Sequence, residues 1–558
     1  MSVPIRRLRR AVLAFVWCLS AFAVGAGTTT VEVAESALIR DCSRCRTGAG
    51  IGINGERMDL GPWAYAPENV ATTAVLFAEA GVRLIRTQEP NIRFQGERAE
   101  RVRSSERWHD PAALNPERKW EWRDPAERYS FWKRQGVKEM ICLSGIVYDP
   151  ETDRMTNGIA QVKKVTCDYL RWLIDHGYRD LIAGIEMQNE PYFGRDPAHY
   201  AALWQELLPE IRSLLPEVPI GIPIAIYEAK DPDLEAVRAR GRKTDRLKSG
   251  KTHDQEHTRQ WVGNAIAGLG DALTNVTHVI IHTYGADAWY TCGIKGIEKA
   301  RFTQRAYPEL AGKQLWITEW RDRSDEDWVC QRKFRTALFK AQYLLMTLGQ
   351  RDVEVTAIHE ARVLSGIFYF SNGEFWRQPI DNEDRKRRFP DLTGKGRPHA
   401  VTACAAGVYR LFNEALDGHP RILAYGAPSG DLSCTKYYES AKRRWKAIRK
   451  GAEELPPVEG EAAWVAAESA DGKSLTVLAV NAKAEPETFR IVRPGIFAGQ
   501  RAHMKVLSCE PGKIDELHVP GEPPWWRMTS SEVILGDGTS FVLPPETVAT
   551  VVIGQTGT

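Results

Sequence analysis

Between about residues 48 and 418, short apolar runs alternate with longer segments in which apolar residues recur every three or four positions. The short runs predict buried strands, and the longer period predicts amphipathic helices. That period is clearest from Tyr200 to Leu214 and from Phe334 to Leu345, and another helix is expected near residues 66–80. Eight runs are predicted as strands: GIGIN (50–54), VRLIRT (82–87), KEMICLS (138–144), GIEMQNE (184–190), IGIPIAI (220–226), HVIIHTY (278–284), QLWITEW (314–320) and EVTAIHEARVL (354–364).

Eight strands, each followed by a helix, predict an α/β fold of the (β/α)8 TIM barrel type over residues 47–419. A doubly wound open sheet shows the same alternation and is the alternative that periodicity alone leaves open. The polar and basic stretch from residue 227 to about residue 253 fits neither element type. It is predicted to be an excursion on the loop after the fifth strand.

The pattern changes after residue 420, where short segments alternate apolar and polar positions between Gly, Pro and Asp turns. Because no convincing helical period remains there, residues 420–558 are predicted to form an antiparallel β-sandwich. The segment TTTVEVAESALIR ahead of the barrel alternates in the same way. We therefore expect an N-terminal strand within residues 28–46 to join that sandwich.

Residues 1–27 have the pattern of a signal peptide, with a basic start, an apolar run and small residues at its end. This pattern predicts cleavage near Ala23 or Ala26 and a secreted or periplasmic protein. No later apolar run reaches the roughly 20 residues that span a bilayer, so stable membrane insertion is not expected. Without this segment, which holds four arginines and no acidic residue, the charge changes from 75 − 72 = +3 to 71 − 72 = −1. A near-neutral protein argues against a nucleic-acid partner.

Nine cysteines follow the predicted signal peptide, so at least one is unpaired. Cys142, Cys167 and Cys404 lie in apolar strand or helix contexts and are predicted to be buried thiols. Cys292 and Cys330 follow two successive predicted strands and could form a disulfide between loops. No second CxxC accompanies Cys42-x-x-Cys45 to complete a four-ligand zinc site. A local disulfide and two free thiols are the alternatives that remain.

Two glutamates end predicted strands of the barrel. Glu190 ends the fourth strand, in Gln-Asn-Glu-Pro, and Glu319 ends the seventh, in Trp-Ile-Thr-Glu-Trp. In such a barrel the carboxyl ends of different strands converge on one face, which holds the active site. Two carboxyls about 5–5.5 Å apart are what hydrolysis of a glycosidic bond with retention requires. Structural salt bridges at two strand ends are the simpler alternative.

The Asn-Glu-Pro at the fourth strand, the His-x-Tyr of the sixth strand and the Glu-Trp of the seventh resemble clan A of the retaining glycoside hydrolases. The resemblance covers about residues 48 to 376 and implies Glu190 as general acid/base and Glu319 as nucleophile. The C-terminal segments are similar to the domain appended in families 39, 51, 30 and 79, with families 39 and 51 closest in layout. The clan as a whole implies no cofactor and no metal.

The same resemblance implies roles for neighbouring residues. Asn189 resembles the residue that binds the substrate 2-hydroxyl, and Tyr284 resembles the tyrosine that hydrogen-bonds the nucleophile. Arg86, at the end of the second strand, resembles the arginine that keeps the nucleophile ionised, while Glu190 is left to keep its proton. His282 is either a site residue or a packed strand residue. Four tryptophans on predicted loops of this face are candidates for sugar stacking, with a core role as the alternative for each: Trp320, Trp289, Trp63 and Trp376.

Two other motifs carry competing chemistry. Gly50, Gly52 and Gly55 spell GxGxxG, but no helix opens after them, so close packing of the first strand is favoured over a dinucleotide site. His253 and His257 belong to an HxxEH pattern typical of zinc sites. A charged excursion precedes this pattern, and no third ligand with the spacing of a zinc motif stands out, so a zinc site is disfavoured.

The sequence therefore predicts a secreted glycosidase acting on oligosaccharides or polysaccharides, in the manner of arabinofuranosidases, xylosidases or glucanases. A catalytically inactive carbohydrate-binding barrel and a zinc-dependent hydrolase are the alternatives.

Overall fold

The computed structural model describes residues 27–55, 70–95, 100–103, 120–225, 255–284, 294–321, 333–359, 368–370, 400–427 and 440–554, with short gaps at 35, 124, 150, 153, 403, 441–442, 445, 449 and 517–523. Residues 1–26 of the predicted signal peptide, the basic excursion and the pair Cys292 and Cys330 lie outside these residues.

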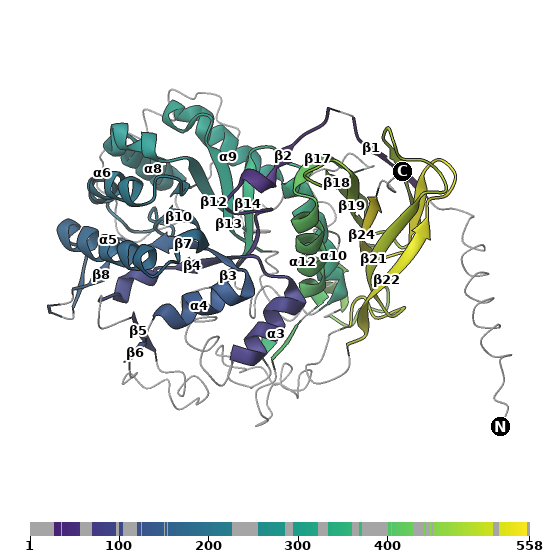
Figure 1. Ribbon diagram of the computed structural model, residues 1–558, viewed down its shortest axis with the longest axis horizontal. Coiled ribbons are helices and arrows are strands. Elements are labelled where there is room, and N and C mark those ends of the chain that lie inside the picture. The colour runs from purple at the N-terminus through teal and green to yellow at the C-terminus, as the bar shows by residue number, and fades with distance from the viewer. Residues whose placement is uncertain are drawn as a thin grey trace.

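Eight parallel strands close into a barrel, which is the fold predicted from the apolar runs (Figure 1). Each strand pairs with the next in chain order, and the last pairs with the first through Thr356 opposite Ile51. This closure rules out the open-sheet alternative. The barrel strands are β3 (Ile51–Gly55), β4 (Leu84–Gln88), β7 (Lys138–Leu143), β10 (Ile182–Met187), β11 (Ile220–Pro223), β12 (His278–Tyr284), β13 (Gln314–Arg321) and β14 (Val353–Ile358).

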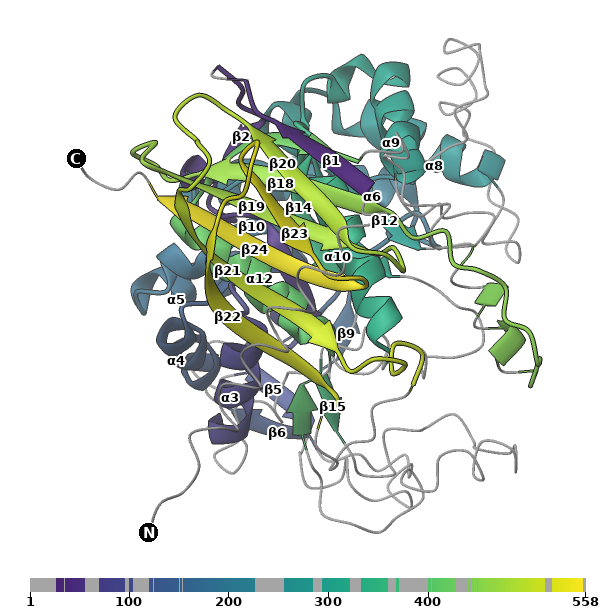
Figure 2. The same cartoon turned by 90° about the vertical axis from the view of Figure 1, so that its right-hand side faces the viewer.

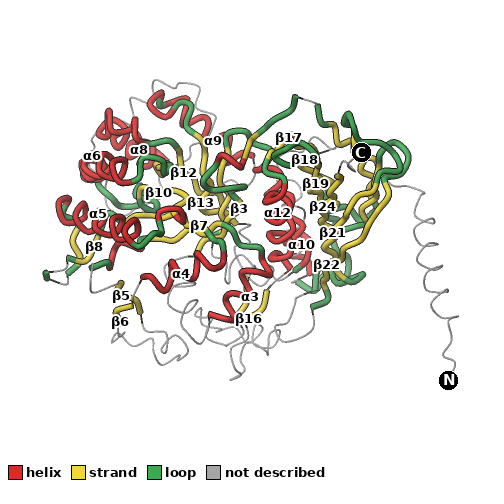
Figure 3. Tube along the Cα trace, viewed as in Figure 1, coloured by secondary structure: helices red, strands yellow, loops and turns green. Residues whose placement is uncertain are grey.

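Helices follow the strands and surround them on the outside, as Figure 3 shows in red around yellow. The helix expected near residues 66–80 is described from Val70 onward. Both helices with the clearest period are present, with Tyr200, Leu203 and Leu207 buried along one face. The helices are α3 (Val70–Ala80), α4 (Pro125–Gln135), α5 (Ile159–Asp175), α6 (Pro197–Leu214), α8 (Gln255–Leu269), α9 (Ile294–Ala306), α10 (Phe334–Leu348) and α12 (Cys404–Gly418).

The lumen of the barrel is filled by side chains, and Trp316 of β13 is the largest of them. It packs with Leu84, Met140 and other buried residues of the strands. Two glycines leave the space for its ring: a Cβ atom on Gly184 would lie 2.6 Å from the ring, and one on Gly221 would lie 2.7 Å from it. At the start of β3, Gly50 has a φ of +73° and a Cβ there would meet the Glu354 carbonyl. Close packing therefore requires glycine at position 50 of the GxGxxG pattern, and at Gly52 a Cβ atom would lie 3.2 Å from Leu84.

A β-sandwich follows the barrel, as the alternating segments predicted (Figure 2). Its larger sheet has the order β2-β17-β18-β19-β24-β21-β22 and its smaller sheet the order β1-β20-β23. The N-terminal strand β1 pairs in parallel with β20, which confirms that the chain ahead of the barrel joins the sandwich. The strands are β1 (Gly27–Glu32), β2 (Arg40–Asp41), β17 (Arg421–Gly426), β18 (Ala462–Glu468), β19 (Ser474–Asn481), β20 (Glu487–Val492), β21 (Arg501–Cys509), β22 (Trp526–Ile534), β23 (Ser540–Leu543) and β24 (Thr547–Gly554).

Helices α10 and α12 lie between the barrel and the larger sheet (Figure 1). All residues of α10 are buried, which is expected of a helix covered on every side. Strand β18 is buried on both faces: Trp464 points into the sandwich core, whereas Val465 packs in the cluster that includes the barrel helices. The two parts of the chain therefore share a continuous apolar interface.

The remaining described elements are short. Three two-stranded sheets accompany the barrel: β5 (Glu100–Arg103) with β6 (Trp120–Arg123), β8 (Val147–Tyr148) with β9 (Met155–Thr156), and β15 (Phe368–Phe370) with β16 (Ala400–Thr402). Helical backbone at several positions between residues 440 and 448 differs from the expectation of no helix after residue 420. Among the described helices, none is both long and apolar enough to cross a membrane.

The described cysteines are free thiols. Cys142, Cys167 and Cys404 are buried, as predicted. Cys42 and Cys45 are also unpaired, so the free-thiol alternative holds for the CxxC pattern. Burial raises the pKa of Cys404 to about 12, which keeps this thiol protonated and unreactive.

Candidate active site

Glu190 lies on a bent segment just beyond the carboxyl end of β10. Both Gln188 and Glu190 have positive φ angles, of 70° and 43°, a region that residues other than glycine adopt at a cost. Gln188 is buried and its amide oxygen accepts a hydrogen bond from the Trp204 indole at 3.5 Å. The backbone bend thus leaves the Glu190 side chain, which is 21% exposed, at the mouth of the barrel.

Glu319 reaches the same place through a shift in strand register. His282 of β12 pairs with Glu319, whereas the preceding pair is Ile281 with Ile317, so Thr318 is the extra residue. Such a shift changes which side chains a strand directs to the barrel interior. As a result, both Thr318 and Glu319 contact residues of the lumen.

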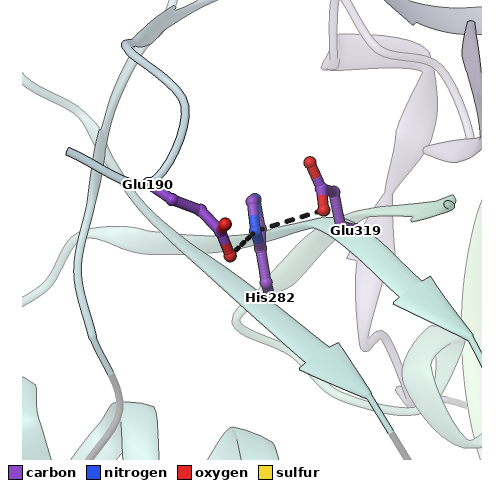
Figure 4. A group of neighbouring side chains, drawn as sticks. All are labelled: Glu190, His282 and Glu319. Atoms are coloured by element: carbon purple, nitrogen blue, oxygen red, sulfur yellow. Dashed lines mark hydrogen bonds and ion pairs between the residues drawn. The ribbon is translucent and has the colours of Figure 1, made fainter. Parts of the chain in front are cut away.

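The two glutamates converge on one histidine (Figure 4). The Nδ1 atom of His282 lies 2.9 Å from Glu190 Oε1 and 3.4 Å from Glu319 Oε2. One oxygen of each carboxyl and a ring nitrogen of His282 all lie within 4.8 Å of one another. His282 is therefore in contact with both glutamates, and it is at the same time a buried residue of β12.

Arg86 holds Glu319 from the opposite side. Its Nη1 donates to Glu319 Oε1 at 2.7 Å, and its Nη2 donates to the Asn189 side-chain oxygen at 2.8 Å. The guanidinium also makes a bidentate pair with Glu186, at 2.6 and 2.8 Å. Both side chains of that pair are completely buried. The expected contact between Arg86 and Glu319 is present, and Glu186 is a partner that the sequence did not predict.

Three further residues contact the pair. Gln88 Nε2 donates to Glu319 Oε1 at 3.0 Å, and His359 Nε2 lies 3.5 Å from Glu319 Oε2. Tyr192 donates to Glu190 Oε1 at 3.4 Å.

The sequence contained a signal for Glu186, because a charged residue within a buried strand needs a partner. For Gln88, the signal was its place two residues after Arg86, on the same face of β4.

The charge of His282 depends on competing effects. Burial alone lowers the pKa of its ring, but the negative charge of Glu319 and the hydrogen bond and charge of Glu190 raise it further than burial lowers it. The pKa of His282 is therefore above its ordinary value. For Arg86, burial opposes the charged form, yet Glu186 and Glu319 keep its pKa well above the usual range.

The tryptophan candidates are not brought together at this site. Trp320 is completely buried and stacks on Tyr343 of α10, with ring centroids 4.0 Å apart. Because successive strand residues point to opposite faces, a Glu319 directed inward places Trp320 outward against the helix. Sugar stacking by Trp320 was wrong, and its core alternative holds. Trp63, Trp289 and Trp376 lie outside the described residues, as does the side chain of Tyr284.

The described residues do not test whether the HxxEH pattern forms a zinc site. His253 lies outside the described residues, and only the backbone of His257 is described, in α8. The atoms of Glu190, His282 and Glu319 are of types that bind divalent cations. However, the guanidinium of Arg86 beside Glu319 disfavours a second positive charge there.

The geometry suits acid and nucleophilic chemistry on a bond placed between the two carboxyls. Glu190 is partly exposed at the mouth, where it can protonate a leaving oxygen. Glu319 is buried among nitrogen donors that favour its anion, the form that attacks. The described residues thus place two carboxyls close together at the carboxyl ends of β10 and β13.

Among protein-family models and among curated proteins, none matches this chain. Solved structures match at low identity: the α-L-arabinofuranosidase of Thermotoga maritima in complex with arabinose is 12% identical over 94% of this chain and 99% of that one, with a TM-score of 0.56. The GH51 α-L-arabinofuranosidase of Thermotoga petrophila RKU-1 has a TM-score of 0.54 at 12% identity, with 94% and 99% covered. For the β-xylosidase of Caulobacter crescentus CB15 the TM-score is 0.50 at 12% identity, with 95% and 100% covered.

These matches extend over nearly the whole chain, so they include the sandwich as well as the barrel. One of them is a member of family 51, a family that the sequence resembles in layout. At 12% identity the likeness concerns the fold. What this chain shares with these structures is the barrel and the sandwich appended to it.

Proposed function

We propose that this protein is a retaining glycoside hydrolase in which Glu190 is the general acid/base and Glu319 the nucleophile. The observation that carries the proposal is the convergence of these two carboxyls, with oxygens within 4.8 Å of each other, from the carboxyl ends of β10 and β13. Retaining enzymes hold their carboxyls about 5–5.5 Å apart, whereas inverting enzymes need about 6.5–9.5 Å to admit a water molecule. The spacing supports retention.

The first step is attack of Glu319 on the anomeric carbon while Glu190 protonates the leaving oxygen. Arg86 and Gln88 both donate to Oε1 of Glu319, so Oε2 is the oxygen on the side of Glu190 and His282. In the second step Glu190 takes a proton from water, which then attacks the glycosyl ester on Glu319. Asn189, whose side-chain oxygen accepts a hydrogen bond from Arg86, is the residue we propose to bind the 2-hydroxyl of the sugar.

The substrates we propose are oligosaccharides or polysaccharides outside the cytoplasm, given the predicted signal peptide. Because structures with this fold include enzymes described as arabinofuranosidases and a xylosidase, arabinofuranosides and xylosides are the first sugars to test. Glucosides complete the panel because the sequence resemblance also covers glucanase-like enzymes.

The assignment is tested with aryl glycosides of these three sugars. Glu319→Gly should lose activity by several orders of magnitude on each substrate that the wild type cleaves. Glu190→Gln should lose about 10²–10⁴-fold on substrates with poor leaving groups and much less on a dinitrophenyl glycoside, which needs no acid. Glu206→Gln, on the exposed side of α6, is the matched control and should retain full activity.

Two results would contradict the proposal. Retention of most activity in Glu319→Gly would remove the nucleophile from the mechanism. Sugar binding without turnover of any substrate, in a wild-type protein of normal stability, would favour the inactive carbohydrate-binding barrel instead.

A further inference from the structure

His282 is surrounded by acceptors on both ring nitrogens. Its side chain is 1% exposed, and Nδ1 faces Glu190 at 2.9 Å and Glu319 at 3.4 Å. On the other side, Nε2 lies 3.2 Å from the Thr318 hydroxyl and 3.9 Å from Glu186 Oε1. Ionised carboxylates only accept hydrogen bonds, so a proton on Nδ1 satisfies both contacts when Glu190 and Glu319 are ionised. Thr318 Oγ1 in turn contacts Glu186 at 3.5 Å as donor, so it is able to accept from Nε2.

The charges around the ring also favour its protonated form. In the part of the chain that the structure describes, three carboxylates contact the ring nitrogens, and Arg86 pairs with two of them, Glu186 and Glu319. His359 lies 3.5 Å from Glu319, and the Tyr192 hydroxyl lies 3.4 Å from Glu190. A neutral ring would leave more negative charge than Arg86 compensates in a buried site, where opposite charges interact strongly.

We propose that His282, as an imidazolium in the resting enzyme, holds the proton that Glu190 delivers to the leaving oxygen. This inference rests on the proposed function of the site and adds a step before the first displacement. His282 acts through Glu190 and does not itself touch the bond that breaks, so it is a positioning residue that also supplies a proton.

The proton moves along the 2.9 Å contact between Nδ1 and Glu190 Oε1. The N–H bond of His282 breaks and an O–H bond forms on Glu190, which leaves a neutral ring with its remaining proton on Nε2. Glu190 then gives this proton to the glycosidic oxygen as the bond to the anomeric carbon breaks and Glu319 forms the ester. When water cleaves the ester, its proton returns to Glu190 and then to Nδ1 of His282, so the cycle balances.

Substrate binding supplies the reason for the transfer. A sugar placed between Glu190 and Glu319 displaces water from the mouth of the barrel, which disfavours the separated charges of the imidazolium and the Glu190 carboxylate. The net upward shift in the pKa of His282, in which Glu319 and Glu190 outweigh burial, agrees with a charged ring before substrate binds. Because the two groups share one proton, the pH profile reports the pair rather than either residue.

The first test measures the ring directly, without substrate. In protein labelled with ¹⁵N-histidine, the His282 signals, assigned by their loss in His282→Asn, should show protons on both nitrogens at pH values where a free histidine is half neutral, about 6.5. In Glu190→Gln the titration midpoint of His282 should fall, because one of the flanking carboxylates is removed. A ring that is neutral at pH 6 in the wild type would overturn the proposal.

The second test separates proton supply from a structural role. His282→Asn keeps a neutral N–H donor near the position of Nδ1 but cannot hold a mobile proton. It should lose about 10²-fold more in kcat/KM on phenyl glycosides than on dinitrophenyl glycosides, and the basic limb of its pH profile should move to lower pH. An equal loss on both substrates with an unmoved basic limb would show that His282 only positions the carboxylates.

His278→Asn is the matched control, since His278 lies on the same strand and faces Glu354 at 2.8 Å, remote from the pair. Its effects should not depend on the leaving group. If the ring is charged but no glycoside is turned over, the proposed function fails, while the charged state of His282 between Glu190 and Glu319 is confirmed. If glycosides are turned over and the ring is neutral, the function stands and this inference fails.

Discussion

At the scale of single residues, the positive charge of Arg86 compensates the negative charges of Glu186 and Glu319 in the barrel lumen. It pairs with Glu186 by two hydrogen bonds and with Glu319 by one, and the Arg86 side chain is completely buried. A buried charge that loses its partner is costly, whereas removal of both charges of a pair together costs far less. The pair with Glu186 therefore matters for the fold, and in the proposed mechanism the contact with Glu319 keeps the nucleophile ionised.

We expect Arg86→Met to destabilise the protein by about 3–5 kcal/mol, because it leaves Glu186 buried without its guanidinium. The double variant Arg86→Met/Glu186→Met should regain most of that stability without regaining activity, since Glu319 still lacks its donor. Urea unfolding followed by fluorescence gives the stabilities, and aryl glycoside turnover gives the activities. Equal destabilisation in the single and double variants would argue against the pairing.

The sequence alone predicted which residues lie near the carboxyl ends of the strands: Glu190 lies just beyond β10, and Arg86 and Glu319 lie close to the ends of β4 and β13. Glu190, Glu319, Arg86 and Asn189 were recognisable because motif and strand end coincide. For Trp320 the sequence left sugar stacking and a core role both open, although alternation along the strand from an inward Glu319 favours the core position that it has. His282 could not be assigned, because its role comes from the carboxylates of two other strands.

At the scale of elements, β13 combines a register shift with a large aromatic side chain. The shift brings both Thr318 and Glu319 into contact with the lumen, and Trp316 fills the space below them. The eight apolar runs predicted the eight strands, whereas closure of the barrel was settled by the pairing of β14 with β3. The runs did not predict the register shift, because the hydrophobic pattern of a strand buried on both faces contains no alternation that would reveal it.

Gly184→Ala should destabilise the barrel by about 1–3 kcal/mol, because the added Cβ would lie 2.6 Å from the Trp316 ring in a packed lumen. Gly418→Ala is the matched control: nothing lies within 4 Å of its Cβ position, so a change within about 0.5 kcal/mol is expected. Thermal unfolding of both variants checks this. In a Trp316→Leu background, where the ring is absent, Gly184→Ala should lower the stability by less than it does in the wild type. An equal loss of stability in both backgrounds would contradict the steric explanation.

For the whole molecule, the contact between barrel and sandwich includes a partly buried group of ion pairs. Asp515, after β21, accepts a bidentate pair from Arg335 of α10 at 2.7 and 2.9 Å and a further hydrogen bond from Arg444 at 3.0 Å. Burial raises the pKa of Asp515, but the hydrogen bonds and charges of these arginines outweigh it, so the pKa is lowered overall. Glu546 lies 3.7 Å from Arg335, and burial raises its pKa.

A carboxyl with a lowered pKa in the folded state adds stability above its unfolded pKa, which is about 3.9 for aspartate, and loses that contribution as pH falls through the folded value. Asp515→Asn should therefore be less stable than the wild type at pH 6, by about 3–5 kcal/mol if both arginines lose their pairing. The difference should shrink below pH 4. A difference that stayed constant from pH 6 to pH 3 would show that the charge of Asp515 does not stabilise the interface.

The configuration of the first product tests the central claim, that Glu190 and Glu319 perform a double displacement, most directly. ¹H NMR of an aryl glycoside during the first minutes of cleavage identifies the anomer before mutarotation mixes the two forms. The oxygens within 4.8 Å predict that the released sugar keeps the anomeric configuration of the substrate. Release of the opposite anomer would contradict this mechanism and the role assigned to Glu319.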